Sequence, residues 1–190
     1  MGRFVLGITG ASGAVVGVEL LKRLLMHDNE VYLVISKNGK DVLKFELDKS
    51  FDKIISELRN KKLFVEDNDD FFSKISSGSF QADAMIIAPC SMGTVGKIAA
   101  GTSDNLMIRA ADVAMKEKRK LVLCVRETPF NSIHLENMLR LSNFGVSIMP
   151  ICPLFYNKPK DINNLISDYV DKVLRLVGQN FDDKSAWNGK

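Results

Sequence analysis

The segment KLVLCVRETPF, residues 120–130, places a charged pair directly after an uninterrupted apolar run. Leu121–Val125 is apolar throughout, as expected of a strand that is buried on both faces. Arg126 and Glu127 follow at once, and a Thr-Pro turn follows them. An arginine can bind a phosphate, and a carboxyl group can transfer a proton. The pair is therefore either a solvated strand end or part of a reaction centre.

A second group of charges lies on a predicted helix, residues 105–117. Arg109, Asp112 and Lys116 are spaced i, i+3 and i+7, which places them on one face of that helix. On an exposed helix they would form ordinary surface ion pairs. Beside a site, the two cations could bind a phosphate dianion, with Asp112 orienting both and Arg126 adding a third positive charge.

A glycine-rich turn follows the first predicted strand. Gly7, Gly10 and Gly13 surround Ser12, and free N–H groups at the start of the next helix would attract a phosphate. The spacing is GxxGxxG rather than GxGxxG, and the second predicted strand ends at Ser36 without the acid that binds the ribose of NAD. NAD is therefore disfavoured, whereas Ser36 suits a phosphate or a flavin edge. A tight turn capped by Ser12 is the purely structural alternative.

Two further segments carry polar groups. In PCSMGT, Ser91, Gly93 and Thr94 offer hydroxyls and amides at a helix start, where they could hold a flat polar ring or simply cap the helix. Cys90 is expected to be a small core residue, because no histidine or cation adjoins it in the sequence. The polar loop SSGSF ends in Phe80, which could pack on a planar ligand or anchor the loop.

Short apolar runs alternate with helical patterns along the whole chain. The predicted strands are 4–9, 31–36, 62–65, 84–88, 120–125 and 146–149, and the predicted helices are 14–26, 37–45, 51–59, 94–100, 105–117, 132–143 and 162–177. Apolar strands that alternate with helices predict a parallel sheet covered on both faces, a three-layer doubly wound α/β domain of Rossmann-like or flavodoxin-like type. Residues 1–178 are expected to form this single domain, and 179–190 a flexible tail. Ligands bind such folds at the carboxyl ends of the strands, so the residues that directly follow each strand are the candidates for a site.

Bulk composition narrows the function classes. A chain of 190 residues with 46% hydrophobic residues can bury one sizeable core, and its net charge of +3 does not favour nucleic acid as a partner. No apolar stretch is long enough for a membrane span. The three cysteines are scattered without a CxxC pair, which favours a reduced cytoplasmic protein and disfavours zinc and disulfides.

These segments together resemble a known family, the flavin prenyltransferases of the UbiX type, related to phenylacrylic acid decarboxylase-like flavoproteins. The matching stretches run from about Phe4 to Val177 and are GITGASGAVVGVELL, SKNGKDVL, SSGSF, PCSMGT, TSDNLMIRAADVAMKEKRKLVLCVRETP, MPICPLFYNKP and the final helix. The resemblance implies transfer of a dimethylallyl group from dimethylallyl monophosphate to N5 and C6 of reduced FMN, without a metal. It also implies a homododecamer whose prenylated FMN serves a UbiD-type decarboxylase.

The resemblance implies a role for each matching residue. FMN would contact Gly10, Ala11, Ser12, Ser36, Ser91, Met92, Gly93, Thr94 and Arg126. The prenyl phosphate would contact Arg109, Lys116, Tyr156 and Lys172, with Phe80 beside it, and the catalytic residues would be Glu127, Arg109, Lys116 and Ser12. Phe80 stands where members often carry tryptophan. Lys172 stands where some carry arginine, which keeps the charge but loses a two-pronged donor.

Two other functions are compatible with the same architecture. A flavin-dependent cysteine decarboxylase is disfavoured, because the only histidines are His27 and His134 and no asparagine follows Ser91. An electron-transfer protein that merely holds FMN would leave the cations Arg109 and Lys116 without a task.

Overall fold

A parallel β-sheet forms the centre of the computed structural model, which describes residues 1–58 and 60–179. Its order is β3-β2-β1-β4-β5-β6, and every neighbouring pair is parallel. The strands are β1 (Arg3–Ile8), β2 (Glu30–Ile35), β3 (Leu63–Glu66), β4 (Ala84–Cys90), β5 (Lys120–Val125) and β6 (Ser147–Ile148). The order reverses between β1 and β4, which is the Rossmann arrangement and one of the two that the sequence left open.

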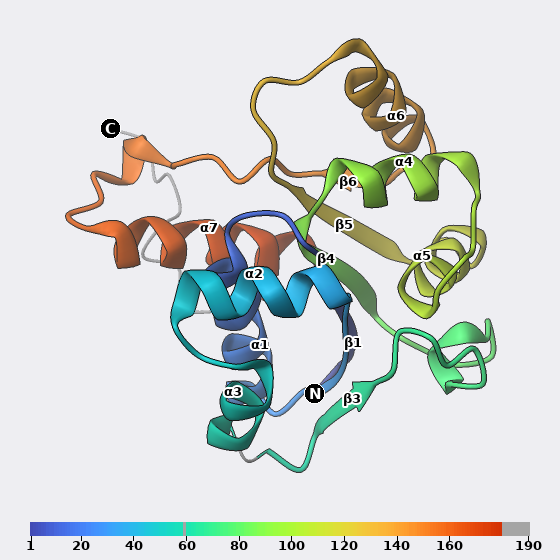
Figure 1. Ribbon diagram of the computed structural model, residues 1–190, viewed down its shortest axis with the longest axis horizontal. Coiled ribbons are helices and arrows are strands. Elements are labelled where there is room, and N and C mark those ends of the chain that lie inside the picture. The colour runs from blue at the N-terminus through green and yellow to red at the C-terminus, as the bar shows by residue number, and fades with distance from the viewer. Residues whose placement is uncertain (59, 180–190) are drawn as a thin grey trace.

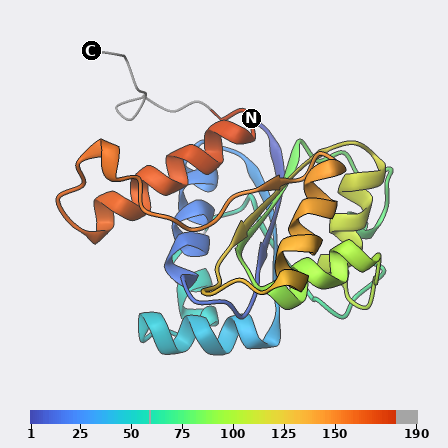
Figure 2. The ribbon, with the colours of Figure 1, turned by 90° about the horizontal axis from the view of Figure 1, so that it is seen from above.

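Helices cover both faces of this sheet (Figure 1). They are α1 (Ala14–Met26), α2 (Lys37–Leu47), α3 (Phe51–Leu58), α4 (Met92–Ala100), α5 (Leu106–Lys116), α6 (Ser132–Asn143) and α7 (Ile162–Leu176), with short 3-10 turns η1 (Lys74–Ser76) and η2 (Phe155–Asn157). Figure 2 shows α1 and α7 on one side of the sheet and α4, α5 and α6 on the other. The three-layer α/β prediction is therefore confirmed.

The strands are apolar throughout because each face of the sheet meets its own hydrophobic core. Phe4, Leu6 and Ile8 of β1 point into the core beneath α1 and α7. Val5, between them, joins the opposite core with the residues of α4 and α5. Such double-sided burial holds the strand ends in fixed positions, so that the loops following them can form a rigid site.

Most predicted elements lie where the sequence places them, and α1, β5 and α6 have the predicted bounds. Strand β4 differs, because it continues through Pro89 to Cys90 rather than closing at the proline. The pairing register with β5 shifts between Ile87 and Cys90, so the missing N–H of the proline falls in an irregular part of the ladder. At the edge of the sheet, β6 keeps only two of its four predicted residues.

The predicted end of the third helix at Arg59, and tail residues 180–190, lie outside the described residues. The last described residue, Gln179, donates its N–H to Leu174 O at 2.9 Å and accepts from Asn29 Nδ2 at 3.0 Å. Within the described ranges no helix combines the length and apolarity needed to cross a membrane.

Candidate active site

A cavity of about 420 Å³ opens at the carboxyl ends of β1, β2 and β4, beside the reversal of strand order. This volume lies within the range of roughly 300–1,000 Å³ that is typical of small-molecule and cofactor sites. The lining residues are Thr9, Gly10, Ser36, Lys37, Asn38, Asn68, Ser91, Gly93, Thr94, Lys97, Asn105, Met107 and Ile108. Five predicted cofactor-binding residues are therefore brought together here: Gly10, Ser36, Ser91, Gly93 and Thr94.

Thr9 joins the two strands that diverge at this point. Its hydroxyl donates to Pro89 O at 2.7 Å and accepts from Ser91 N at 2.9 Å. Its own N–H also donates to Pro89 O, at 3.2 Å. Thr9 is only 3% exposed, its bond to Pro89 O is buried and its bond from Ser91 N is partly buried, so these bonds fix the end of β1 against the turn after β4.

The turn after β4 begins helix α4 with Ser91 as its N-cap. Ser91 Oγ accepts from Thr94 N at 3.3 Å and lies 3.0 Å from Thr94 Oγ1. The side chain of Met92 is buried in the core, so its main-chain N–H is the group available to a ligand. At Gly93 an added Cβ would find its nearest neighbour, Ser91 Oγ, at 4.0 Å, which leaves open space beside the helix start. These features suit a planar, polar ring edge.

The turn after β1 lies tightly against the start of α2. A Cβ on Gly10 would be 2.6 Å from Asn38 Cβ, so only glycine fits there. Ser36 caps α2 by accepting from Gly39 N at 3.0 Å, and its own N–H donates to Ile8 O at 3.0 Å. The first amides of α2, with Lys37 and Asn38 on the cavity wall, form a surface suited to a phosphate.

The start of α1 is not such a surface, contrary to the sequence prediction. The carboxylate of Glu46, on α2, accepts from Gly13 N at 3.0 and 3.1 Å and from Ala14 N at 2.8 Å. These are the amides that the sequence predicts to be free for a phosphate. Ser12 does not cap the helix, since Gly13 is its N-cap.

The other predicted flavin contacts are not among the residues that line the cavity. Ala11 is buried in the core, and Ser12 is exposed. Arg126 and Glu127 follow β5 as predicted, and both are exposed. Arg126 N donates to Cys90 O at 3.2 Å, and a Glu127 carboxylate oxygen accepts from Thr128 N at 3.0 Å.

The cations of α5 are paired differently from the prediction. Arg109 Nη1 bonds Asp112 Oδ2 at 2.8 Å, whereas Lys116 Nζ pairs with Glu117 Oε1 at 2.6 Å. Asp112 therefore orients one cation and not both. Asp112 lies within one turn of Arg109, whereas Glu117 adjoins Lys116 directly and takes its ammonium group.

The remaining predicted substrate contacts also lie outside the cavity lining. The ring of Phe80 packs edge-on against Tyr32, with centroids 4.8 Å apart, and the guanidinium of Arg3 lies 5.1 Å from its centroid. Tyr156, in η2, is 49% exposed, and Lys172 is exposed on α7. A single chain thus assembles the predicted cofactor side more fully than the predicted phosphate side.

Several residues that line the cavity are not predicted from the sequence. Asn105 caps α5 and is recognisable as a helix start, while Lys97 lies one turn beyond Thr94 and pairs with Asp104 at 2.6 Å. Asn68 comes from the loop after β3 and carries no local signal.

Burial raises the pKa of the Cys90 thiol well above its ordinary value, in agreement with the predicted core role. Among the described residues no group of three or more His, Cys, Asp or Glu side chains is placed to hold a metal.

An open parallel sheet with a polar cavity where its strand order reverses defines the class of doubly wound nucleotide-binding proteins. The family model described as Flavoprotein matches residues 2–178. The chain is 48% identical over 178 residues to the flavin prenyltransferase UbiX of Methanocaldococcus jannaschii, covering 93% of each chain. It is 44% identical to the mitochondrial flavin prenyltransferase PAD1 of Saccharomyces cerevisiae, covering 98% of this chain and 76% of the relative. The chain therefore belongs to the Flavoprotein family and, within it, to the UbiX-type flavin prenyltransferases.

Solved structures agree with this placement. The crystal structure of AnUbiX (PadA1) in complex with FMN and dimethylallyl pyrophosphate has a TM-score of 0.94 and 40% identity, covering 100% of this chain and 98% of that one. A dodecameric FMN-dependent UbiX-like decarboxylase from Escherichia coli O157:H7 has a TM-score of 0.91 and 42% identity, covering 98% and 100%. The FMN-dependent cysteine decarboxylase TvaF is only 13% identical, with a TM-score of 0.64, and shares the fold alone.

Proposed function

We propose that this enzyme transfers a dimethylallyl group from dimethylallyl monophosphate to N5 and C6 of reduced FMN. The observation that carries the proposal is the likeness to AnUbiX, which was crystallised with FMN and dimethylallyl pyrophosphate. The cavity supports it, because its volume, the helix-start amides and hydroxyls of Ser36 and Ser91 on its wall and the open space at Gly93 fit a phosphate-bearing planar cofactor.

Residues of this chain divide the work. Gly10, Ala11, Ser12, Ser36, Ser91, Met92, Gly93, Thr94 and Arg126 would hold FMN, which supplies the nucleophilic ring atoms. Arg109, Lys116, Tyr156 and Lys172 would bind the prenyl phosphate, beside Phe80. When the allylic C–O bond breaks, its electron pair stays on the phosphate, and the cations stabilise that charge. Glu127 would donate or relay a proton to the leaving phosphate, whose second pKa is about 6.

The proposal includes assembly into a homododecamer in which neighbouring copies complete the phosphate side of the site. Large apolar side chains are exposed on α6 and on the segment from η2 to α7, among them Ile133 at 65%, Leu139 at 64%, Phe155 at 72% and Ile162 at 69%. Exposed apolar surfaces of this kind mark interfaces. The solved E. coli relative is dodecameric. Sedimentation analysis of the purified protein tests this, and a monomer at micromolar concentration would contradict it.

We further propose that the product serves a UbiD-type decarboxylase and that the enzyme works in a reducing compartment such as the cytoplasm. The reducing compartment is supported by three free cysteines, Cys90, Cys124 and Cys152. The service to a UbiD-type decarboxylase is tested by adding the released flavin to an apo-decarboxylase of that type and measuring CO₂ release. Unmodified FMN serves as the control.

The reaction itself is tested directly. The protein is incubated with FMN, dithionite and dimethylallyl monophosphate without oxygen, and the released flavin is analysed by mass spectrometry. A mass gain of one dimethylallyl unit is expected. Unmodified flavin, with the diphosphate tested as well, would refute the transferase and favour an FMN-holding electron carrier.

Glu127→Gln tests the proton-transfer role. The variant should bind FMN as the wild type does but transfer the prenyl group about 10²–10⁴-fold more slowly, the usual contribution of a general acid. Glu57→Gln, at an exposed site on α3 whose carboxylate pairs with Lys49, is the matched control and should keep full activity. Loss of FMN binding in Glu127→Gln would make Glu127 structural instead.

A further inference from the structure

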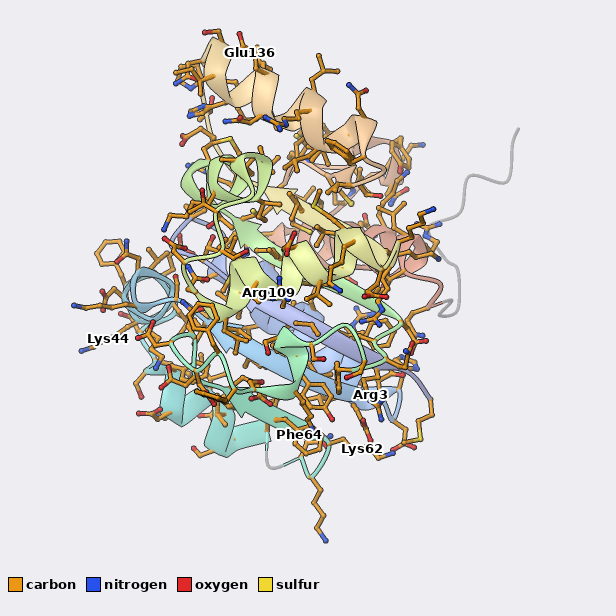
Figure 3. The ribbon with its side chains drawn as sticks, turned by 90° about the vertical axis from the view of Figure 1, so that its right-hand side faces the viewer. Arg3, Lys44, Lys62, Phe64, Arg109 and Glu136 are labelled. Atoms are coloured by element: carbon orange, nitrogen blue, oxygen red, sulfur yellow. The ribbon has the colours of Figure 1, made fainter. Side chains whose placement is uncertain are left out.

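The loop Ser76–Phe80 is fixed to α5 through its main-chain carbonyls. Arg109 Nε donates to Ser76 O at 3.1 Å. Arg119, three residues beyond the end of α5, donates from Nη2 to Gly78 O and from Nη1 to Phe80 O, both at 2.6 Å. Figure 3 looks onto this face of the molecule, with Arg109 near its centre and Arg3 and Phe64 below it.

Only arginine offers the geometry seen at Arg119. Its planar guanidinium carries donors in a rigid fork, so one side chain can bond two carbonyls that lie two residues apart. Hydrogen bonds from a charged donor are about twice as strong as neutral ones. Arg119 is half-buried, which limits competition from water. The fork therefore sets the path of the chain between Gly78 and Phe80.

The path of the loop in turn limits where Lys116 can lie. A Cβ on Gly78 would be 2.8 Å from Lys116 Nζ and would collide with Glu117 Oε1. The backbone at Gly78 is thus in close contact with the Lys116–Glu117 ion pair. Hydroxyls of Ser77 and Ser79, 2.9 Å apart, lie on the same short loop.

An aromatic cluster holds the two ends of the loop. Lys74 Nζ, just before it, lies 4.5 Å from the ring centroid of Tyr32, 5.0 Å from that of Phe64 and 5.8 Å from that of Phe80. Phe80, at the other end, packs edge-on against Tyr32. With both ends held by cation–π and ring contacts, Arg119 determines the conformation of the middle.

We propose that Arg119 and Gly78 are positioning residues for the prenyl-phosphate site: Arg119 holds the loop, and the bare backbone of Gly78 lets the Lys116 ammonium lie where it meets the leaving phosphate. The inference rests on the proposed function, since Lys116 matters here as a phosphate-binding cation. Neither Arg119 nor Gly78 needs to contact the substrate.

The test compares Arg119→Met, Arg119→Lys and Gly78→Ala with the wild type. Both Arg119 variants and Gly78→Ala should raise KM for dimethylallyl monophosphate roughly tenfold to hundredfold, because a charged contact is misplaced, with FMN affinity within about twofold of the wild type. Lys44→Met, which removes one exposed charge on α2, is the control and should change neither. Unchanged KM in Arg119→Met and Gly78→Ala would overturn the inference, as would a rise in KM that is accompanied by an equal loss of FMN affinity.

A second readout does not depend on prenyl transfer. Amide hydrogen exchange in residues 76–80 should accelerate in Arg119→Met but not in Lys44→Met, and the affinity for inorganic phosphate should fall in Arg119→Met and Gly78→Ala alike. Wild-type enzyme that releases only unmodified flavin would refute the proposed function, yet exchange and phosphate binding would still report on the loop. Unaltered exchange in Arg119→Met would refute its holding role even in an active enzyme.

Discussion

Replacing Thr9 by valine tests whether the strand junction positions the flavin site. Valine has the shape of threonine, so no cavity forms and only the hydroxyl is lost. That hydroxyl bonds Pro89 O at 2.7 Å and Ser91 N at 2.9 Å. Pro89 O would keep the Thr9 N–H at 3.2 Å, but Ser91 N would lose this acceptor. A buried donor without an acceptor costs about 1–3 kcal/mol, and this donor is partly buried beside a 3% exposed residue, so we expect the free energy of unfolding to fall by about 2 kcal/mol.

The loss of this hydrogen bond should lower both the melting temperature and the affinity for FMN. For a chain of this size about 2 kcal/mol corresponds to a decrease in Tm of roughly 4–8 °C. Because Ser91 starts the turn that lines the cavity, FMN affinity, measured by flavin fluorescence titration, should fall about tenfold, which corresponds to about 1.4 kcal/mol. Thr9→Ser keeps the hydroxyl and is the control. If Thr9→Val binds FMN as tightly as Thr9→Ser, the junction does not position the site.

Three other changes follow from the geometry. Gly10→Ala places a Cβ 2.6 Å from Asn38 Cβ, so it should lower the free energy of unfolding, measured with denaturant, by about 1–3 kcal/mol and should weaken FMN binding. Gly96→Ala is the control: its added Cβ would have its nearest neighbour 3.6 Å away, so the free energy of unfolding should not fall. Glu46→Gln removes the charge at the start of α1 and should lower the free energy of unfolding by about 1–2 kcal/mol; an unchanged value would show that the carboxylate is dispensable. Burial raises the pKa of Cys124 from 9.0 to about 12, so above pH 9.0 the thiol ionises in the unfolded chain first and the free energy of unfolding should fall as pH rises toward about 12. The buried thiol should also resist DTNB at neutral pH, and a rapid reaction in the native state would contradict the burial.

Local patterns predicted the elements well where burial and capping agree with the sequence. Strand β5 is apolar from Leu121 to Val125; the charged Lys120 stands at its start, and the charged Arg126 follows its end. Helix α6 begins at the cap Asn131, whose side chain accepts from His134 N. Strand β4 was shortened in the prediction because proline usually interrupts a ladder, whereas here a register shift accommodates Pro89.

The site was predicted only where its residues directly follow strands. Ser36 and Ser91 come immediately after β2 and β4, so topology alone brings them to the cavity. Glu46 lies ten residues after Ser36, at the far end of α2, and its carboxylate reaches the start of α1 only through tertiary packing. No spacing rule could have shown that this carboxylate takes the amides that seemed free for a phosphate.

The loop between β3 and β4 holds α5 at both of its ends, and this links the two sides of the site. Asn68 O accepts from Leu106 N at 2.8 Å and Asn68 Oδ1 from Met107 N at 3.1 Å, which fixes the start of the helix. Gly78, ten residues later, is bonded by Arg119 beyond the helix end. The helix start lines the cavity, and Lys116 is its last residue, so one loop sets the position of both. Asn68 bonds the helix itself, and a helix transmits displacement along its axis as a rigid element, so a change at Asn68 should disturb FMN binding and prenyl-phosphate binding together. Arg119 lies beyond the helix end and bonds only the carbonyls of the loop, so a change there should disturb the phosphate side alone.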